Sequence, residues 1–159
     1  MKFEKIKLDE ARKVVDEFRP YMSDEELGRA LETLKMPTRA TEGSAGYDIR
    51  CPFDVIIHKG ESRAIPLLIK VVGMSLHTAL FVFNRSGLSL KHGLRIDNSV
   101  CVIDSDYDLC IWYQATAHTE DVVIRANDRI CQGVFIDFLT VQDDKPRAKR
   151  KGGIGSTGK

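Results

Sequence analysis

The sequence predicts an all-β protein of the sandwich or jelly-roll type that carries a helical extension at its N-terminus. After Pro37, short stretches rich in β-branched and aromatic residues recur roughly every 8 to 15 residues. Gly, Asn, Asp or Pro residues separate them, as in β-sandwiches and jelly rolls, and no strand–helix–strand alternation interrupts them. The predicted strands are FDVII (53–57), LLIKVV (67–72), ALFVF (79–83), SVCVI (99–103), LCIWY (109–113), DVVIR (121–125) and ICQGVFIDF (130–138).

Residues 1–36 have a helical pattern. Ser23 and Glu26 are spaced as a capping box, in which each side chain binds a free amide of the first helical turn. A second helix is predicted over residues 9–18, and Pro20 would stop it. The apolar stripe of the capped helix is Leu27, Ala30, Leu31 and Leu34. We therefore expect a helical hairpin over residues 1–36, a β-domain over 37–142 and a flexible arm over 143–159.

Composition limits the classes of protein. A chain of 159 residues is about one domain long, and its formal net charge of +1 argues against a general affinity for nucleic acid. No apolar run approaches the roughly 20 residues that cross a bilayer, and the charged N-terminus is unlike a secretion signal. We expect a cytoplasmic protein without membrane or direct nucleic-acid contacts. Its four cysteines, which form no CxxC pair, are expected to be buried thiols: Cys51, Cys101, Cys110 and Cys131.

The C-terminal segment is basic and rich in glycine. It ends in GGIGSTGK, which fits the spacing of a phosphate-binding P-loop. A P-loop needs a buried strand before it and a helix after it, whereas here a polar linker precedes the glycines. The segment is either a solvated basic tail or a flexible arm that wraps phosphates with backbone amides and the hydroxyls of Ser156 and Thr157.

Two further segments combine polar side chains with strands. In residues 84–93, Arg85 offers a fork of donors and Gly87 permits close backbone approach, although a simple turn is an alternative. In NSVCVIDSDY (98–107), Asn98 could read a base edge, Asp104 could orient water and Tyr107 could pack on a sugar. A strand that runs into a turn explains the same pattern.

The order of five motifs resembles that of the trimeric dUTPase family. The motifs are AGYD, RSGL-x-x-KHG, VIDSDY, DRI-x-Q and GG-x-GSTG, and together they span roughly residues 34–159. The resemblance implies a jelly-roll-like β-barrel and a homotrimer whose active sites are shared between subunits. It also implies Mg²⁺-assisted hydrolysis of dUTP to dUMP and diphosphate, which limits uracil in DNA and supplies dUMP for dTMP synthesis.

The same resemblance assigns the catalytic and metal-associated residues. Asp104 would orient and deprotonate the water that attacks the α-phosphorus, and Gln132 would contact the phosphate or that water. Asp48 would support Mg²⁺ through the water shell of the metal, because Mg²⁺ takes most of its ligands from triphosphate oxygens and water.

The remaining assignments concern substrate binding. Tyr107 would stack under the deoxyribose, and Asn98, with the hairpin backbone around Val102 and Ile103, would read uracil. Three residues of a neighbouring subunit would hold the phosphates, and an arm would close the site, with Trp112 as a further aromatic cap. These residues are Arg85, Ser86 and Gly87 for the phosphates, and Lys149, Arg150, Ile154, Gly155, Ser156 and Thr157 in the arm.

The chain departs from the family pattern at several positions. Cys101 and Asn127 stand where glycine is usual, and Asn tolerates the left-handed conformation. Asp108-Leu109 replaces the usual pair after the tyrosine, and Ile154 replaces the Phe that caps the base. The alternatives are a dCTP deaminase of the same fold and a dUTP-binding regulatory protein. In the latter, a protein partner would bind the N-terminal helices.

Overall fold

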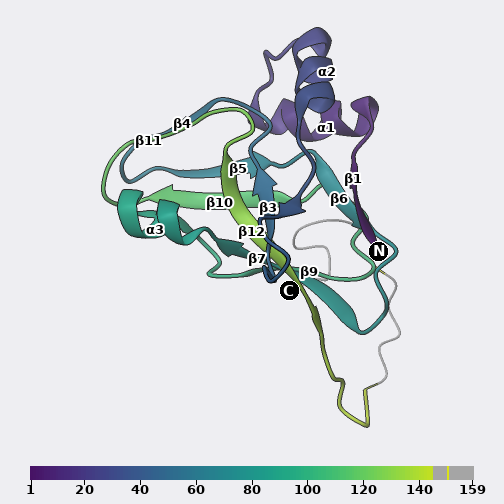
Figure 1. The fold of residues 1–159 in the computed structure, drawn as a ribbon. Helices are drawn as coiled ribbons and strands as arrows, with labels where there is room; N and C mark the ends of the chain where they lie inside the picture. The colour runs from purple at the N-terminus through teal and green to yellow at the C-terminus, as the bar shows by residue number, and fades with distance from the viewer. Residues whose placement is uncertain (145–149, 151–159) are drawn as a thin grey trace.

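The computed structural model describes residues 1–144 and residue 150 (Figure 1). Every strand pairing is antiparallel, and the largest sheet has five strands. The all-β, jelly-roll-like fold is confirmed. In order across that sheet, the strands are β2 (Thr38–Arg39), β3 (Tyr47–Arg50), β12 (Arg129–Asp137), β7 (Thr78–Asn84) and β9 (Cys101–Ile103).

Three smaller sheets complete the β-structure. Alternation of buried and exposed side chains shows why they form: Val55 and Ile57 are buried, whereas Ile56 between them is 50% exposed. This period of two places one face of each strand in the core. The three sheets are β5 (Ser62–Pro66), β10 (Trp112–Ala117) and β8 (Leu94–Ile96); β11 (Val122–Ile124) and β4 (Val55–Ile57); and β1 (Lys2–Lys5) and β6 (Ile69–Val72).

The N-terminal extension packs on the barrel through two helices, α1 (Leu8–Phe18) and α2 (Asp24–Thr33). The predicted capping box is present, because the Ser23 side chain accepts from the Glu26 amide at 3.2 Å and the Ser23 amide donates to the Glu26 carboxylate at 2.8 Å. Val15 and Leu27 are fully buried in the common core.

The extension is not wholly helical, contrary to expectation. Its first residues form β1, which pairs with β6 over four positions, from Lys2 opposite Val72 to Lys5 opposite Ile69. A four-residue strand is too short to show a periodic signal, and its edge position comes from the tertiary pairing. Residues 1–36 therefore contribute a strand as well as two helices to the structure.

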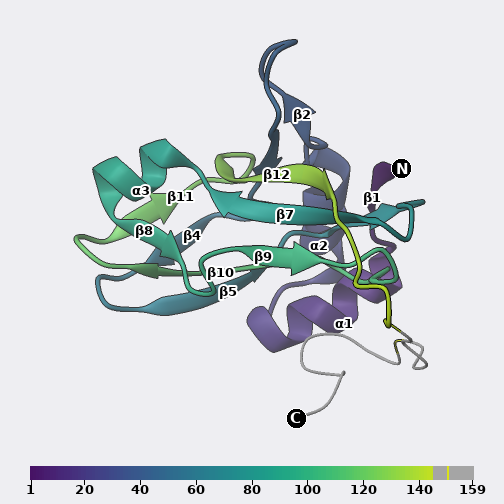
Figure 2. The same cartoon turned by 90° about the horizontal axis from the view of Figure 1, so that it is seen from below.

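Residues 86–92 form a helix, α3 (Ser86–His92), where the sequence favoured a turn. It lies away from α1 and α2, at another end of the barrel (Figure 2). Gly93 ends it in the left-handed conformation, at φ 64°, as is common after a helix. A Cβ at Gly93 would lie 2.3 Å from the Thr119 hydroxyl, so glycine is also required by space.

Other predictions about composition and local conformation can be compared with the structure. All four cysteines are free thiols; three are buried and Cys101 is partly buried. Asn127 adopts φ 68°, which confirms the expected left-handed backbone. In residues 1–144, no helix combines the length and apolar character needed to cross a membrane. Besides β1, four strands were not anticipated from the sequence: β2, β3, β5 and β8.

Candidate active site

One cluster of polar side chains, the arginine pocket, consists of Asp48, Arg85, Ser86, Arg129 and Gln132. It lies at one end of β3 and β12 and has a volume of about 430 Å³. Asp48 accepts ion pairs from Nε of Arg85 and from Arg129, each at 3.1 Å. The Asp48 side chain is only 14% exposed, so the carboxylate holds both guanidinium groups at the wall of the pocket.

Backbone pairing fixes Gln132 in this pocket. Gln132 lies opposite Asp48 in the β3–β12 ladder, and its side-chain amide donates to the Asn84 carbonyl oxygen at 3.1 Å. A Cβ at Gly46 would lie 2.8 Å from Oε1 of Gln132. The glycine of the AGYD motif therefore makes room for the glutamine side chain, which explains why these two motifs occur together in one site.

A second cluster, the acidic loop, comprises residues 104–108 and follows β9. Asp104, Asp106 and Asp108 are exposed, whereas Tyr107 between them is 8% exposed. The Tyr107 amide donates to the Asp104 carbonyl oxygen at 3.1 Å, which closes a turn. Burial raises the pKa of the Tyr107 hydroxyl to about 12, so this side chain is a neutral ring at ordinary pH.

Arg150 lies against the acidic loop. Its guanidinium forms ion pairs with Asp104 and with Asp106, the latter at 2.9 Å, and lies 5.5 Å from the centre of the Tyr107 ring. The sequence comparison offered either Lys149 or Arg150 as the residue of the arm that binds the γ-phosphate. In the structure Arg150 is paired with the predicted catalytic carboxylate instead.

The two clusters lie far apart within one chain. Strand β7 separates them, because Leu80 pairs with Ile103 of β9 and Phe83 pairs with Gln132 of β12. Three residues along a strand correspond to about 10 Å, and two strand spacings add about 10 Å across the sheet. Asp104 begins beyond the end of β9, so a single chain does not bring it next to Gln132.

Asn98 lies in the turn between β8 and β9 and is exposed. Sequence comparison suggested a hairpin here, but β8 pairs with β10 and β9 pairs with β7. The segment therefore crosses from one sheet to another, and Ser99 turns it with φ 61°. The expected ladder-paired hairpin is wrong because both flanking strands find their partners elsewhere in the barrel.

The two residues proposed to contribute hairpin backbone differ in their exposure. Val102 is 49% exposed, whereas the Ile103 side chain is buried in the core. Only the backbone of Ile103 is thus open to a ligand. Gly87 lies in the first turn of α3, and a Cβ there would meet no atom within 4 Å. Gly87 is therefore not required by close contact with another part of the same chain.

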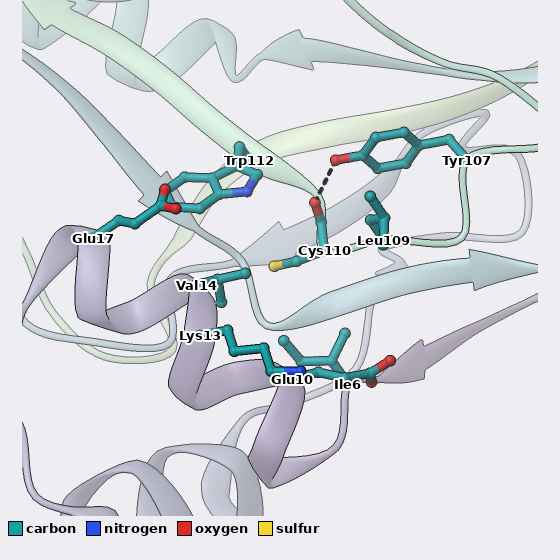
Figure 3. Close-up of a pocket in the computed structure, with 9 residues that line it drawn as sticks. All are labelled: Ile6, Glu10, Lys13, Val14, Glu17, Tyr107, Leu109, Cys110 and Trp112. Atoms are coloured by element: carbon teal, nitrogen blue, oxygen red, sulfur yellow. Dashed lines mark hydrogen bonds between the residues drawn. The ribbon is translucent and has the colours of Figure 1, made fainter. Parts of the chain in front are cut away.

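Trp112 lies in a groove between α1 and the acidic loop (Figure 3). The groove has a volume of about 620 Å³, and Tyr107 forms part of its wall. Glu17 of α1 lies beside the Trp112 ring, and Leu109 lies next to Tyr107, with Cys110 on the side toward Trp112. The indole thus faces the N-terminal extension, and its suggested contact with uracil stays a prediction.

The donor set suits a magnesium ion that is already bound to a triphosphate. Within the described residues, no group of three His, Cys, Asp or Glu side chains is placed to hold a metal ion. Asp48 has both carboxylate oxygens facing arginines. A single carboxylate, rather than a cluster of them, fits contact with the water shell of Mg²⁺, since the ion binds few carboxylates and keeps several waters.

Several residues of interest were not singled out from the sequence, and others lie outside the described residues. Arg129 and Asp106 occur within the DRI-x-Q and VIDSDY motifs, yet only the ion pairs of the folded chain reveal their partners. The predicted arm residues that the structure does not describe are Lys149, Ile154, Gly155, Ser156 and Thr157.

Comparison with known proteins identifies the family of this chain. The dUTPase family model matches residues 32–158. The chain therefore belongs to the dUTPase family. It is 40% identical over 134 residues to the deoxyuridine 5'-triphosphate nucleotidohydrolase of Lactococcus lactis subsp. lactis, covering 79% of this chain and 89% of that protein. It is 36% identical to the corresponding protein of Haemophilus influenzae (strain PittEE), covering 78% and 87%.

Solved structures agree with this assignment. The crystal structure of the dUTPase from Streptococcus mutans has a TM-score of 0.67 and 29% identity, and the match covers 89% of this chain and 99% of that one. A dUTPase from phage phi11 of S. aureus, at 19% identity and a TM-score of 0.64, shares the fold over 74% of this chain and 92% of its own.

Proposed function

We propose that this protein hydrolyses dUTP to dUMP and diphosphate, as a dUTP diphosphatase. Membership of the dUTPase family supports this activity. Asp104 would orient and deprotonate the attacking water, since its carboxylate is 54% exposed directly after strand β9. Removal of dUTP would limit uracil in DNA, and the product would supply dTMP synthesis. We place the activity in the cytoplasm, in keeping with four free cysteines.

The separation of Asp104 from Gln132 by β7 carries the proposal for how the site is assembled. Hydrolysis requires water, phosphate and neutralising groups in one place, and one chain leaves its two clusters apart. We infer that the acidic loop of one subunit meets the arginine pocket of another in a homotrimer. Three copies would then form three sites.

The arginine pocket would bind the triphosphate. Arg85 and Ser86 would donate to phosphate oxygens, with the Gly87 backbone nearby, and Gln132 would contact the phosphate or the attacking water. Mg²⁺ would neutralise phosphate charge when it enters with the nucleotide. The coordination of a structural Mg(II) ion is described for the phage phi11 enzyme; here Asp48 would contact the water shell of the metal.

The acidic loop would recognise the nucleoside. Tyr107 presents a ring whose position is fixed by burial, and this ring would lie under the deoxyribose and exclude a 2′-hydroxyl. Asn98 and the backbone of Val102 and Ile103 would read uracil, because unpaired polar groups would penalise cytosine. Residues 149–157 would close over the nucleotide, with Ile154 and Trp112 near the base and Lys149 or Arg150 at the γ-phosphate.

A rate assay tests the proposal. Diphosphate release is measured with dUTP, dCTP, dTTP and UTP, with and without Mg²⁺, for the wild-type protein and for Asp104→Asn. We expect turnover of dUTP above the others and a fall of about 10²- to 10⁴-fold in Asp104→Asn, the range for loss of a general base. Asp108→Asn is the matched control, as it removes the same charge from the same loop. Absence of dUTP turnover by the wild type would contradict the proposal.

Subunit mixing tests the shared site. Asp104→Asn and Gln132→Ala chains are each expected to be nearly inactive alone. Co-refolded mixtures should regain activity, because some sites would combine an intact acidic loop with an intact arginine pocket. No regain in mixtures that native mass spectrometry shows to contain hetero-trimers would place both residues of a site in one chain.

A further inference from the structure

The Arg150 side chain makes several contacts with the acidic loop. Its side chain is 16% exposed although the two aspartates that it contacts are 54% and 56% exposed. Nε donates to Asp106 at 2.9 Å, NH2 donates to Asp104, and the guanidinium faces the Tyr107 ring at 5.5 Å. Three different groups of one loop therefore fix a single guanidinium.

Asp106 accepts a hydrogen bond from Nε of Arg150 at 2.9 Å. The pKa of Arg150 is raised above its ordinary value, and the hydrogen bond to Asp106 is the largest cause. Asp108, two residues further along the same loop, is also exposed but makes no ion pair within the described residues. The loop thus contains one aspartate that binds Arg150 beside another that does not.

The position of Arg150 conflicts with the roles proposed for its neighbours in the nucleotide complex. A guanidinium on Asp104 competes for the oxygens that would bind the attacking water. A guanidinium over Tyr107 covers the ring on which the deoxyribose would lie. Both contacts must break before a nucleotide can bind in the proposed way.

We propose that Asp106 is a positioning residue that keeps Arg150 on Asp104 and Tyr107 until the nucleotide displaces it. This inference rests on the proposed function, because dUTP is the displacing ligand. On displacement, the guanidinium exchanges carboxylate oxygens for phosphate oxygens, which it binds with similar geometry. Asp106 thereby sets how easily the site opens.

Binding of the non-hydrolysable analogue α,β-imido-dUTP with Mg²⁺ measures this effect at equilibrium. Asp106→Asn should bind the analogue about two- to fivefold more tightly than the wild type, the range expected for loss of one exposed ion pair in the free state. Asp108→Asn should show a smaller gain, since it only reduces repulsion. The difference between the two variants should shrink at high salt because exposed charges are screened.

A double-mutant comparison separates the ion pair from other effects of the substitution. In an Arg150→Ala background, Asp106→Asn should change the Kd no more than Asp108→Asn does. Asp106→Glu, which restores the carboxylate, should return the Kd toward that of the wild type. Equal gains for Asp106→Asn and Asp108→Asn, or weaker binding by Asp106→Asn, would overturn the inference.

Trypsin cleavage provides a readout that needs no nucleotide. Trypsin must capture the Arg150 side chain to cut after it, so the ion pairs should protect this bond. Mass spectrometry should show the fragment 1–150 forming faster in Asp106→Asn than in Asp108→Asn or the wild type. Equal rates would show that Asp106 does not hold Arg150. Failure of the wild type to bind the analogue would instead contradict the proposed function.

Discussion

The hydroxyl of Tyr107 donates a hydrogen bond of 2.8 Å to the backbone carbonyl of Cys110. This bond ties the end of the ring to the chain that leads into β10, so the barrel itself sets the plane of the ring. A nucleotide would therefore meet a preformed surface. Preformed surfaces discriminate between sugars sterically, because they do not move aside for an additional hydroxyl.

Substitution of Tyr107 should separate the ring from its hydroxyl. Tyr107→Phe keeps the ring and should keep the preference for dUTP over UTP, at a cost of about 1 kcal/mol in the free energy of unfolding for the lost hydrogen bond. Tyr107→Ala removes the ring and should reduce the preference at least about tenfold, or about 1.4 kcal/mol. Rates with both nucleotides measure the ratio, and an unchanged ratio in Tyr107→Ala would assign sugar selection elsewhere.

Substitution of Asp48 should weaken the arginine pocket. Asp48→Asn leaves Arg85 and Arg129 without their shared counter-charge, so we expect kcat/KM for dUTP to fall about 10- to 100-fold, as for other residues that support a metal site. Rates measured against free Mg²⁺ should also show a higher half-saturating concentration. Asp137→Asn, which alters the other end of β12, is the control and should change neither value. A fall in kcat/KM with unchanged Mg²⁺ dependence would limit Asp48 to orienting the arginines.

The N-terminal extension should contribute to stability. Leu27 of α2 is fully buried in the core, so Leu27→Ala should lower the free energy of unfolding by about 2 to 5 kcal/mol. Leu90→Ala is the matched control, because the Leu90 side chain is 85% exposed. Urea unfolding of both variants gives the comparison. If both variants lose a similar, small part of the free energy of unfolding, the extension does not unfold together with the barrel.

Asn127 should link the extension to the barrel in two ways. Its side chain accepts from the Lys35 amide at 2.8 Å and donates to the Thr33 carbonyl at 3.2 Å. Asn127→Gly loses both bonds but retains the left-handed backbone, whereas Asn127→Ala also incurs backbone strain. Asn127→Ala should therefore be less stable than Asn127→Gly by about 1 to 2 kcal/mol. Equal stabilities of Asn127→Ala and Asn127→Gly in thermal unfolding would show that the turn changes its conformation and so avoids the backbone strain.

Alkaline pH should destabilise the fold. Burial raises the pKa values of Cys51 and Cys110 from 9.0 to about 12. Above about pH 9 the unfolded chain loses these protons while the folded chain keeps them. Because the unfolded chain then binds fewer protons than the folded chain, the free energy of unfolding falls as pH rises from 9 toward 12. Urea unfolding at neutral pH and at about pH 10 measures the loss. Cys51→Ala/Cys110→Ala should show a weaker pH dependence, and an unchanged one would contradict this origin.

Local patterns in the sequence predicted α1, α2 and most strands of the described residues, but not α3. The Ser23–Glu26 box and its apolar stripe encode α2 directly, because capping and periodicity act over one or two turns. The left-handed backbone at Asn127 likewise follows from the residue type. The ordered motifs also identified the family, and they predict site roles for Asp104, Tyr107 and Gln132, since the chemistry of a site requires particular side chains.

Only the tertiary structure decided which of these residues meet. The sequence suggested a hairpin around Asn98, but pairing of β8 with β10 and of β9 with β7 sends the segment between two sheets. Strand partners depend on contacts between distant segments, which no local pattern contains. For the same reason, the ion pairs of Asp48 with Arg129 and of Asp106 with Arg150 appear only when the folded chain brings together residues 81 and 44 positions apart.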